Sequence, residues 1–290
     1  WWMCLIPMET VREIGLALPA FIKWDDAEYC LRAGEAGFPT VSVPGIALWH
    51  VSWVGKDDTI DWQAYFHARN RIVAALIHSE VPEGGTLLRH SRRMDLKHLM
   101  MMQYYPTALR HRALRDILSG PEHMWHTLAT AMPEARALAS KFPETVVHTA
   151  DSTRLRARRG RVVFKQTKRH EFDSPAGLAL RWFTLRTLMS HWLRQPNPAN
   201  VVQPEVEFGK LDAHWWRVPA YDSALVSSAD GRGKAIYTRD RSQFRRMLRD
   251  SLALHRQLRR RWPNLAEQYR RDLPQLTSPD AWRAVFEAER

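Results

Sequence analysis

Apolar and polar positions repeat with a helical period over most of the chain. The clearest case is DWQAYFHARNRIVAALIHSE at 61–80, where Asp61 stands at the expected start of a helix as its N-cap. The apolar residues on or near one face of this helix are Phe66, Ile72, Val73, Leu76 and Ile77. The pattern predicts a strong amphipathic helix.

Further helices are predicted after residue 90. The first covers 91–118, and Pro106 is expected to kink or split it because proline lacks a backbone N–H. Its expected core residues are Leu96, Leu99, Met100 and Met102. The other helices are predicted at 121–139, at 175–193, from Arg239 onward as a long basic helix, and from Pro279. This part of the chain is therefore expected to be mainly helical.

Two segments carry β-strand signals. In HWWRVPAYDSALVSSADGRGKAIYTRD at 214–240, the turn residues ADGRG separate two strand-like runs, which predicts a hairpin. RLRARRGRVVFKQTKRH at 154–170 predicts a β-like pair around Gly160. The helical part is thus expected to include a small β element.

The N-terminal part predicts a helix followed by two short strands. Asp25 or Asp26 is placed to cap a helix that Gly37 ends. PTVSVPG at 39–45 alternates like a strand, and 46–51 is a second short extended piece. This order is typical of the end of an α/β domain. VPEGG at 81–85 is interpreted as a linker, which divides the chain into 1–81 and 82–290.

Charge supports the same division. The chain has 290 residues, 45% apolar, with a net charge of +12. Residues 1–81 hold 6 Lys/Arg and 10 Asp/Glu, a net charge of −4, and residues 82–290 hold 37 and 21, a net charge of +16. Such a cationic body favours anionic surroundings: membrane headgroups, nucleic acid or a phosphorylated ligand. Only Cys4 and Cys30 are present, which favours a reducing compartment over a disulfide framework.

The most suggestive chemistry lies in FIKWDDAEYCLRAGEAGFPTVSVPGIALWH at 21–50. A carboxylate at a helix start tends to stay ionised and suits a general base acting on an alcohol. The side chains of Asp25 and Asp26 are expected to point in different directions, so one can hold a substrate while the other takes a proton. In the alternative interpretation, one is an N-cap and the other is a solvated charge. His50 is either a structural residue or a metal ligand that needs partners.

Tryptophans are dense in the same segment. They are Trp1, Trp2, Trp24, Trp49, Trp53 and Trp62. Indoles form cores, but with neighbouring carboxylates they also form platforms for sugar rings. CxxC, HExxH and GxGxxG motifs are absent, so zinc-finger, zincin and Rossmann interpretations have no support. The basic runs RARRGR, FKQTKRH and RQLRRRWP carry no nucleic-acid recognition motif, and a peripheral anionic membrane suits them equally well.

Three stretches of the chain together resemble a known family: the motif WDDAE…WH, the segment KDDTIDWQAYFHARNRIVAAL and the segment MDLKHLMMMQYYPTALRHRAL. The family that they closely resemble is that of the polymerising galactofuranosyltransferases of mycobacterial and actinobacterial galactan synthesis. The resemblance covers nearly the whole chain. It implies an α/β fold: the C-terminal part of an inverting GT-A glycosyltransferase domain, followed by a mainly α-helical domain with a small β-hairpin element. It also implies transfer of galactofuranose from UDP-galactofuranose to a growing cell-wall galactan.

The resemblance assigns roles to particular residues. Asp26 matches the general base, and Asp25 lies beside the donor sugar. His50 matches a ligand of the divalent metal, Mn²⁺ or Mg²⁺. Lys23 and His67 match residues near the donor diphosphate. The aromatics matched to the sugar-binding pocket are Trp2, Trp24 and Trp53.

The family's Asp-x-Asp motif has no counterpart in a suitable place, because Asp57-Asp58 follows the histidine. The chain begins WWMC, so we expect the missing motif and the uridine site to lie upstream of residue 1, and the 290-residue chain to be inactive alone. The expected partners are UDP-galactofuranose, a lipid-linked galactan acceptor and an anionic membrane surface. Nucleic acid is not expected, and a homo-oligomer is possible. The expected location is cytoplasmic, peripheral at the inner face of the plasma membrane.

Two other interpretations remain open. One is a family-two transferase with another nucleotide-sugar donor, such as rhamnose or glucosamine. The other is a non-enzymatic cationic module that binds membrane or nucleic acid, with WDD as a helix cap. The latter predicts salt-dependent nucleic-acid binding.

Overall fold

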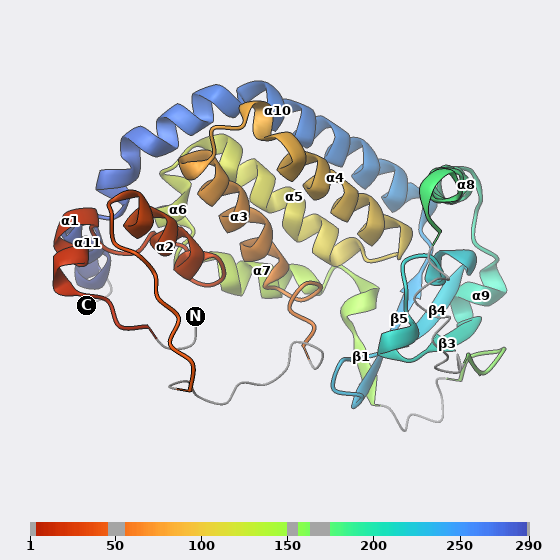
Figure 1. The fold of residues 1–290 in the computed structure, drawn as a ribbon. Helices are drawn as coiled ribbons and strands as arrows, with labels where there is room; N and C mark the ends of the chain where they lie inside the picture. The colour runs from red at the N-terminus through yellow and green to blue at the C-terminus, as the bar shows by residue number, and fades with distance from the viewer. Residues whose placement is uncertain (1–3, 46–55, 150–155, 163–174, 289–290) are drawn as a thin grey trace.

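A long helix spans the molecule and organises the rest. The computed structural model describes residues 4–45, 56–149, 156–162 and 175–288. Helix α10 (Arg241–Leu276) arches over α3 (Ala64–His78), α4 (Gly85–Met100) and α5 (Tyr104–Ser119), as Figure 1 shows. The small sheet lies at one end of this body, and the N-terminal helices α1 and α2 lie at the other. The remaining helices are α1 (Met8–Ile14), α2 (Asp25–Glu35), α6 (His123–His126), α7 (Ala131–Ala139), α8 (Gly177–Leu193), α9 (Pro198–Val202) and α11 (Pro279–Ala288).

Helix α3 lies at the centre of the core, which explains its apolar sequence. Toward the sheet, Phe66 packs in one cluster with Phe208 and Phe244. Toward α10, Leu76 packs in a second cluster with Leu258, and both side chains are fully buried. Helix α3 therefore shares its core with elements that follow residue 82. The division into 1–81 and 82–290 stays a prediction.

The predicted helix around Pro106 is split, as expected. Helix α4 ends at Met100, and α5 begins at Tyr104. Met102 between them has a φ of 61°. Pro106 stands in the first turn of α5, where a missing N–H breaks no helical bond. The helix predicted at 121–139 is interrupted instead, since α6 and α7 are separate.

The predicted hairpin is present within a larger sheet of order β1-β5-β4-β3-β2. Its strands are β1 (Val147–Thr149), β2 (Arg161–Val162), β3 (Val206–Phe208), β4 (Ser223–Ser227) and β5 (Gly233–Thr238). Strands β4 and β5 are antiparallel and joined through the ADGRG turn. Strand β3 is parallel to both β4 and β2. In the segment 154–170, where a β-like pair was predicted around Gly160, β2 follows Gly160 and pairs with β3. Residues 163–174 lie outside the described residues.

Three expectations for the N-terminal part are corrected. Neither Asp25 nor Asp26 caps α2, because Trp24 is the N-cap residue, with a φ of 66°, and both aspartates lie in the first turn. Gln63, not Asp61, is the N-cap of α3, although Asp61 accepts a bond from the Gln63 N–H at 2.7 Å. Residues 39–45 form no strand, because no described strand lies beside them to pair with. The strand predicted at 46–51 lies outside the described residues.

Candidate active site

The segment before α2 has an unusual backbone. Phe21, Lys23 and Trp24 have φ values of 69°, 67° and 66°. Residues other than glycine in this left-handed region cost about 1–3 kcal/mol each. Such a conformation persists only where the surroundings hold it, and here the surroundings are side chains of α3.

Two adjacent residues of α3 hold this segment. The Asn70 side-chain amide donates to the carbonyl oxygens of Ala20, Ile22 and Lys23, at 3.1, 2.8 and 2.8 Å. The Arg69 guanidinium donates to the Ala20 oxygen at 2.7 Å and to Asn70 Oδ1 at 2.7 Å. Both side chains are buried. They fix where α2 begins, and therefore where the aspartate pair lies.

Asp25 and Asp26 lie in the first turn of α2, where the helix dipole favours a negative charge. Both residues are partly exposed. Asp26 Oδ1 accepts a bond from the Ala27 N–H at 2.8 Å. A carboxylate that is hydrogen-bonded to the backbone and reachable from solvent has the position that a general base requires.

Lys23 and His67 converge on one carboxylate, that of Asp58. Lys23 Nζ lies 2.8 Å from Asp58 Oδ2, and His67 Nε2 lies 3.8 Å from the same oxygen. Burial alone would raise the pKa of Asp58, but the bond and charge of Lys23 lower it below its ordinary value. Burial, together with the Lys23 charge, lowers the pKa of His67. At neutral pH the group is therefore a Lys–Asp ion pair beside a neutral imidazole.

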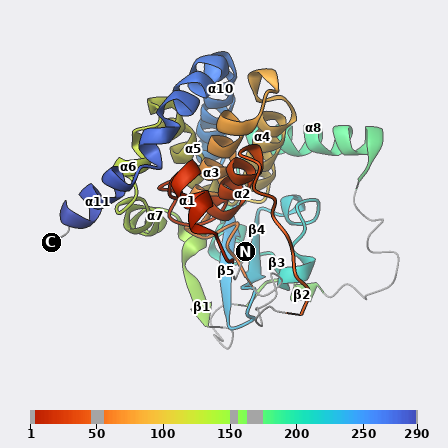
Figure 2. The ribbon, with the colours of Figure 1, turned by 60° about the vertical axis from the view of Figure 1, so that its left-hand side comes forward.

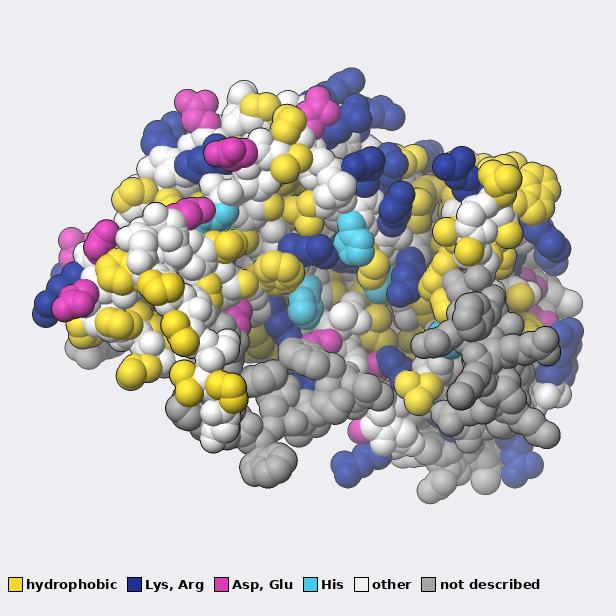
Figure 3. Space-filling view, viewed as in Figure 1, with side chains coloured by type: hydrophobic (Ala, Val, Ile, Leu, Met, Phe, Trp, Pro, Cys, Tyr) yellow, Lys and Arg dark blue, Asp and Glu magenta, His cyan; other side chains and the backbone are white. Residues whose placement is uncertain are grey.

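A cationic cavity of about 160 Å³ lies beside these residues, lined by Trp24 and His67. Arg71, His90 and Arg110 also line it. The Arg71 guanidinium lies 5.4 Å from the centre of the Trp24 ring, so the indole face is in contact with a cation. The space-filling view shows blue and cyan side chains gathered over this part of α3 and α4 (Figure 3). An anionic group fits this lining better than a neutral one.

Helix α2 is docked to α3 by a buried charged cluster. Glu28 Oε1 lies 3.0 Å from Arg32 Nε and 3.2 Å from His78 Nε2 at the end of α3. His78 Nδ1 lies 2.8 Å from Glu35 Oε1. Burial would lower the pKa of His78, but its bonds to Glu28 and Glu35 raise it. The cluster fixes the second end of the helix that carries the aspartates.

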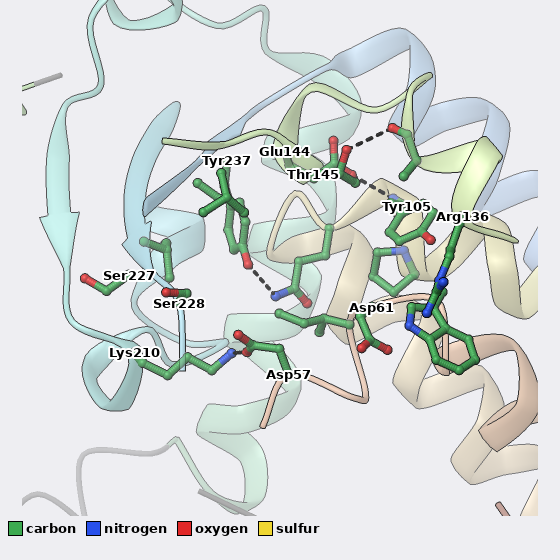
Figure 4. Close-up of a pocket in the computed structure, with 18 residues that line it drawn as sticks. Asp57, Asp61, Tyr105, Arg136, Glu144, Thr145, Lys210, Ser227, Ser228 and Tyr237 are labelled. Atoms are coloured by element: carbon green, nitrogen blue, oxygen red, sulfur yellow. Dashed lines mark hydrogen bonds and ion pairs between the residues drawn. The ribbon is translucent and has the colours of Figure 1, made fainter. Parts of the chain in front are cut away.

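A second cavity, of about 290 Å³, lies between the helical body and the sheet (Figure 4). Trp62, Tyr105 and Tyr237 form aromatic parts of its wall, and Asp61 and Glu144 contribute carboxyl groups. Burial raises the pKa of both carboxyl groups. Aromatic rings interleaved with hydrogen-bonding groups are the lining that sugar rings require.

The loop 57–62 separates the two cavities. Asp58 faces Lys23, whereas its neighbour Asp57 forms an ion pair with Lys210 and accepts a bond from the Ala229 N–H at 2.9 Å. Figure 4 shows Lys210 reaching toward Asp57 at the edge of the larger cavity. Asp57 and Asp58 therefore link the region of the WDD motif to the sheet: Asp58 contacts Lys23, and Asp57 contacts the backbone of Ala229.

Five of the eight predicted site residues lie on α2, on α3 or in the segment just before α2: Lys23, Trp24, Asp25, Asp26 and His67. His50, Trp2 and Trp53 lie outside the described residues. Within the described ranges, no group of three or more His, Cys, Asp or Glu residues could hold a metal ion. The described residues alone therefore do not form a metal site.

Sequence reasoning missed Asp58, Arg69 and Asn70. The signal for the last two was their place between apolar residues of α3 that the pattern assigns to the core. Polar side chains at buried helical positions require partners, and here the partners are the carbonyls before α2.

Comparisons with known proteins give the family to which the chain belongs. The model for the family "Galactofuranosyltransferase-2, domain 3" matches residues 87–288. Galactofuranosyltransferase GlfT2 of Mycolicibacterium smegmatis is 39% identical over 289 residues, 100% of this chain and 44% of the relative. The protein of the same name from Mycobacterium tuberculosis is 38% identical over 288 residues, 99% of this chain and 44% of the relative.

These matches place the chain among the glycosyltransferases. Within that class, it belongs to the galactofuranosyltransferase-2 family. The chain spans 44% of the length of the curated relatives it matches. Among the described residues, no helix is both long and apolar enough to pass through a bilayer.

Proposed function

We propose that the chain is the C-terminal part of a transferase that moves galactofuranose from UDP-galactofuranose to a growing cell-wall galactan. The observation that carries this proposal is the identity of 38–39% to galactofuranosyltransferases along the whole chain. The site supports the proposal, because the WDD motif stands at the start of α2. Buried side chains of α3 hold this start in place by hydrogen bonds to the preceding carbonyls.

In the proposed mechanism, Asp26 is the general base. It takes the proton of an acceptor galactan hydroxyl while that oxygen attacks the anomeric carbon of the donor. The bond from the anomeric carbon to UDP breaks in the same displacement, so the configuration inverts. Asp25 orients donor or acceptor hydroxyls. The anchoring of α2 supports these roles, since a base must be held within hydrogen-bond reach of the proton it removes.

The donor diphosphate would lie near Lys23 and His67. The cavity beside them supports this placement, because the Arg71 guanidinium in its wall can neutralise phosphate charge. Trp24, with its face against Arg71, would border the sugar. Asp58 would keep Lys23 oriented before the donor arrives.

We further propose a divalent metal, Mn²⁺ or Mg²⁺, with His50 among its ligands. Such an ion would neutralise charge on the departing UDP. The described residues do not complete its ligand set, so the remaining ligands would have to come from elsewhere in the protein. The roles proposed for Asp25 and Asp26 do not depend on this metal ion.

The acceptor chain would lie along the larger cavity. This placement is supported by the aromatic wall and by the loop 57–62, which joins that cavity to the WDD region. In this arrangement the sugar that reacts lies at Asp26, and sugars already added to the chain contact Trp62 and Tyr105. Peripheral contact with an anionic membrane would bring a lipid-linked acceptor to the site.

Donor competition tests this function against its alternatives. The full gene product that carries the chain is assayed with a short galactofuranose acceptor and Mn²⁺. We expect transfer from UDP-galactofuranose and none from rhamnose or glucosamine donors. Preferred use of another donor would contradict the proposed substrate. Absence of any transfer, together with salt-dependent nucleic-acid binding, would favour the non-enzymatic cationic module.

A further inference from the structure

A hollow of about 440 Å³ lies between α4 and α10, apart from the candidate active site. The two helices lie side by side in both ribbon views (Figure 1 and Figure 2). Leu88 of α4 lines this hollow, whereas its neighbour Leu87 lines the cavity beside His67. Because neighbouring residues of a helix point in different directions, the two spaces lie on different sides of α4.

Four exposed arginines line this hollow, the arginine pocket: Arg89 and Arg92 on α4, and Arg256 and Arg259 on α10. The members of each pair are three residues apart, so the two side chains of a pair lie on the same face of their helix. Guanidinium groups therefore reach the pocket from both of its sides.

Little acidic charge accompanies these arginines. Of the described residues that line the pocket, only Glu83 carries a carboxylate, and its Oε2 lies 3.7 Å from Arg259 Nε. Within the described ranges, Arg89, Arg92 and Arg256 have no ion-pair partner. Residues 84–94 contain three arginines and residues 251–262 contain four, and neither stretch contains Asp or Glu. With four arginines and one glutamate, the lining has a net charge of +3 at neutral pH.

The floor of the arginine pocket is fixed by buried bonds between the same two helices. His255 lies there, 5% exposed, and its Nδ1 donates to the Ser251 carbonyl at 2.8 Å. The Ser91 hydroxyl donates to His255 Nε2 at 3.0 Å, and the Ser251 hydroxyl donates to Asp95 Oδ2 at 2.7 Å. Burial lowers the pKa of His255, so the positive charge of the pocket comes from the arginines. Because these bonds join α4 to α10, they fix the spacing of the two arginine pairs.

We propose that the arginine pocket binds a soluble oligophosphate, a small molecule that carries two or more phosphate groups. Planar guanidinium groups bind phosphate oxygens through pairs of parallel hydrogen bonds, and arginines from two sides can hold neighbouring phosphates at once. The volume lies within the range of about 300–1,000 Å³ that is typical of small-molecule pockets.

The shape of the arginine pocket favours a molecule that enters from solution. Its apolar residue Leu88 is buried at the floor, where it would contact an apolar part of the ligand, and does not form an exposed ridge. The site is separate from the donor position beside Lys23 and His67, and the inference does not depend on the proposed transfer reaction.

Calorimetric titration of the full gene product with inorganic tripolyphosphate tests this proposal. Arg92→Gln/Arg256→Gln removes one guanidinium from each helix, and Arg92→Lys/Arg256→Lys keeps the charge but removes the paired bonds. Arg246→Gln/Arg260→Gln is the matched control, because these exposed arginines of α10 do not line the pocket. Arg71→Gln removes a cation from the cavity beside His67 and reports on binding at the donor position.

We expect the wild type, the control and Arg71→Gln to bind tripolyphosphate with similar affinity. The double glutamine variant should bind it at least about tenfold more weakly, and the double lysine variant should lie between them. Equal affinity in the wild type and the glutamine variant would overturn the proposal, as would an equal loss in the control or a loss in Arg71→Gln alone.

Vesicles that contain phosphatidylglycerol distinguish a soluble ligand from a lipid headgroup, which offers the same phosphate chemistry. Vesicle binding that needs Arg92 and Arg256, in a protein that does not bind tripolyphosphate, would assign the arginines to a headgroup and overturn the proposal. Galactofuranose transfer is not measured in these titrations, so failure of the proposed function would leave their result unchanged.

Discussion

At the scale of single residues, the position of the aspartate pair depends on Asn70. Its amide is shared among three carbonyls of a segment that contains three residues with positive φ. The adjacent Arg69 supports both the amide and the Ala20 carbonyl. The conformation before α2 is thus held from outside the segment, by side chains about 50 residues away in sequence.

Asn70→Ala removes the bonds to the partly buried carbonyls of Ile22 and Lys23, whereas the Ala20 carbonyl keeps its bond from Arg69. We expect it to lower the free energy of unfolding by about 1–3 kcal/mol. It should also lower kcat and raise KM of the full gene product, because both Asp26 and Lys23 are positioned by the segment that Asn70 holds. Denaturant unfolding and steady-state kinetics measure the two effects. Asn200→Ala, which removes another buried asparagine outside the candidate site, is the control, and an equal loss of kcat in both variants would contradict a specific role for Asn70.

At this scale the sequence and the family resemblance suggest the candidate site residues, whereas the hydrogen bonds that position them become evident only in the structure. The sequence and the family resemblance bring Lys23, Asp25, Asp26 and His67 into one site, and the structure places these residues on adjoining elements. The cap assignment is wrong because Trp24 takes the N-cap position, a choice that depends on bonds from α3. A pattern of residues cannot show which carbonyls a buried asparagine will contact.

At the scale of elements, the docking of α2 on α3 depends on protonation of His78. The pKa of His78 is raised in the folded state, so its contribution to stability is complete below the unfolded pKa of about 6.5 and is lost as the pH rises through the higher folded value. The free energy of unfolding of the wild type should therefore fall more between about pH 6 and about pH 9 than that of His78→Gln. Denaturant titrations of both proteins measure this difference, and parallel pH profiles would contradict it.

Two glycines, Gly84 at the junction between α3 and α4 and Gly34 in α2, give a matched pair of substitutions. Gly84 has a φ of 68°, and an added Cβ would lie 2.6 Å from Leu88 and 2.8 Å from Trp262. Gly34 lies within α2 with nothing within 4 Å of such a carbon. We expect Gly84→Ala to destabilise the protein and Gly34→Ala to stabilise it by about 0.4–1 kcal/mol. Thermal unfolding measures both, and a stable Gly84→Ala protein would show that this close packing is not required.

Helices were more predictable than strands for a physical reason. The amphipathic patterns of α3 and α10 specify helices locally, and both helices are present. The segment 39–45 alternates like a strand, but a strand needs a neighbour, and alternation alone cannot supply one. Helix α8 has apolar residues on both faces, a pattern that normally indicates burial on all sides. The exposure of apolar side chains such as Leu178 and Trp182 becomes evident only in the folded molecule.

At the scale of the whole molecule, one helical body links the WDD region to the basic C-terminal part. Helix α3 packs on both α5 and α10, and the loop 57–62 joins the candidate site to the sheet. The sequence predicted a mainly helical domain with a β-hairpin, and both are present. The assignment of 1–81 to a GT-A domain remains a proposal.

The purified 290-residue chain should not turn over the donor, since its described residues do not complete a metal site and the expected Asp-x-Asp motif is absent. Release of UDP from UDP-galactofuranose is the measurement, with the full gene product as the positive control. Turnover by the short chain at a rate comparable to that of the control would contradict this expectation.

The most direct test of the account compares Asp26→Asn with Asp25→Asn in the full gene product. Transfer from UDP-galactofuranose to a short galactofuranose acceptor is measured, together with donor binding and unfolding. The account predicts that Asp26→Asn lowers kcat by about 10²–10⁴ with donor binding and stability retained, whereas Asp25→Asn mainly raises KM. Near-normal kcat in Asp26→Asn would contradict the assignment of Asp26 as the base.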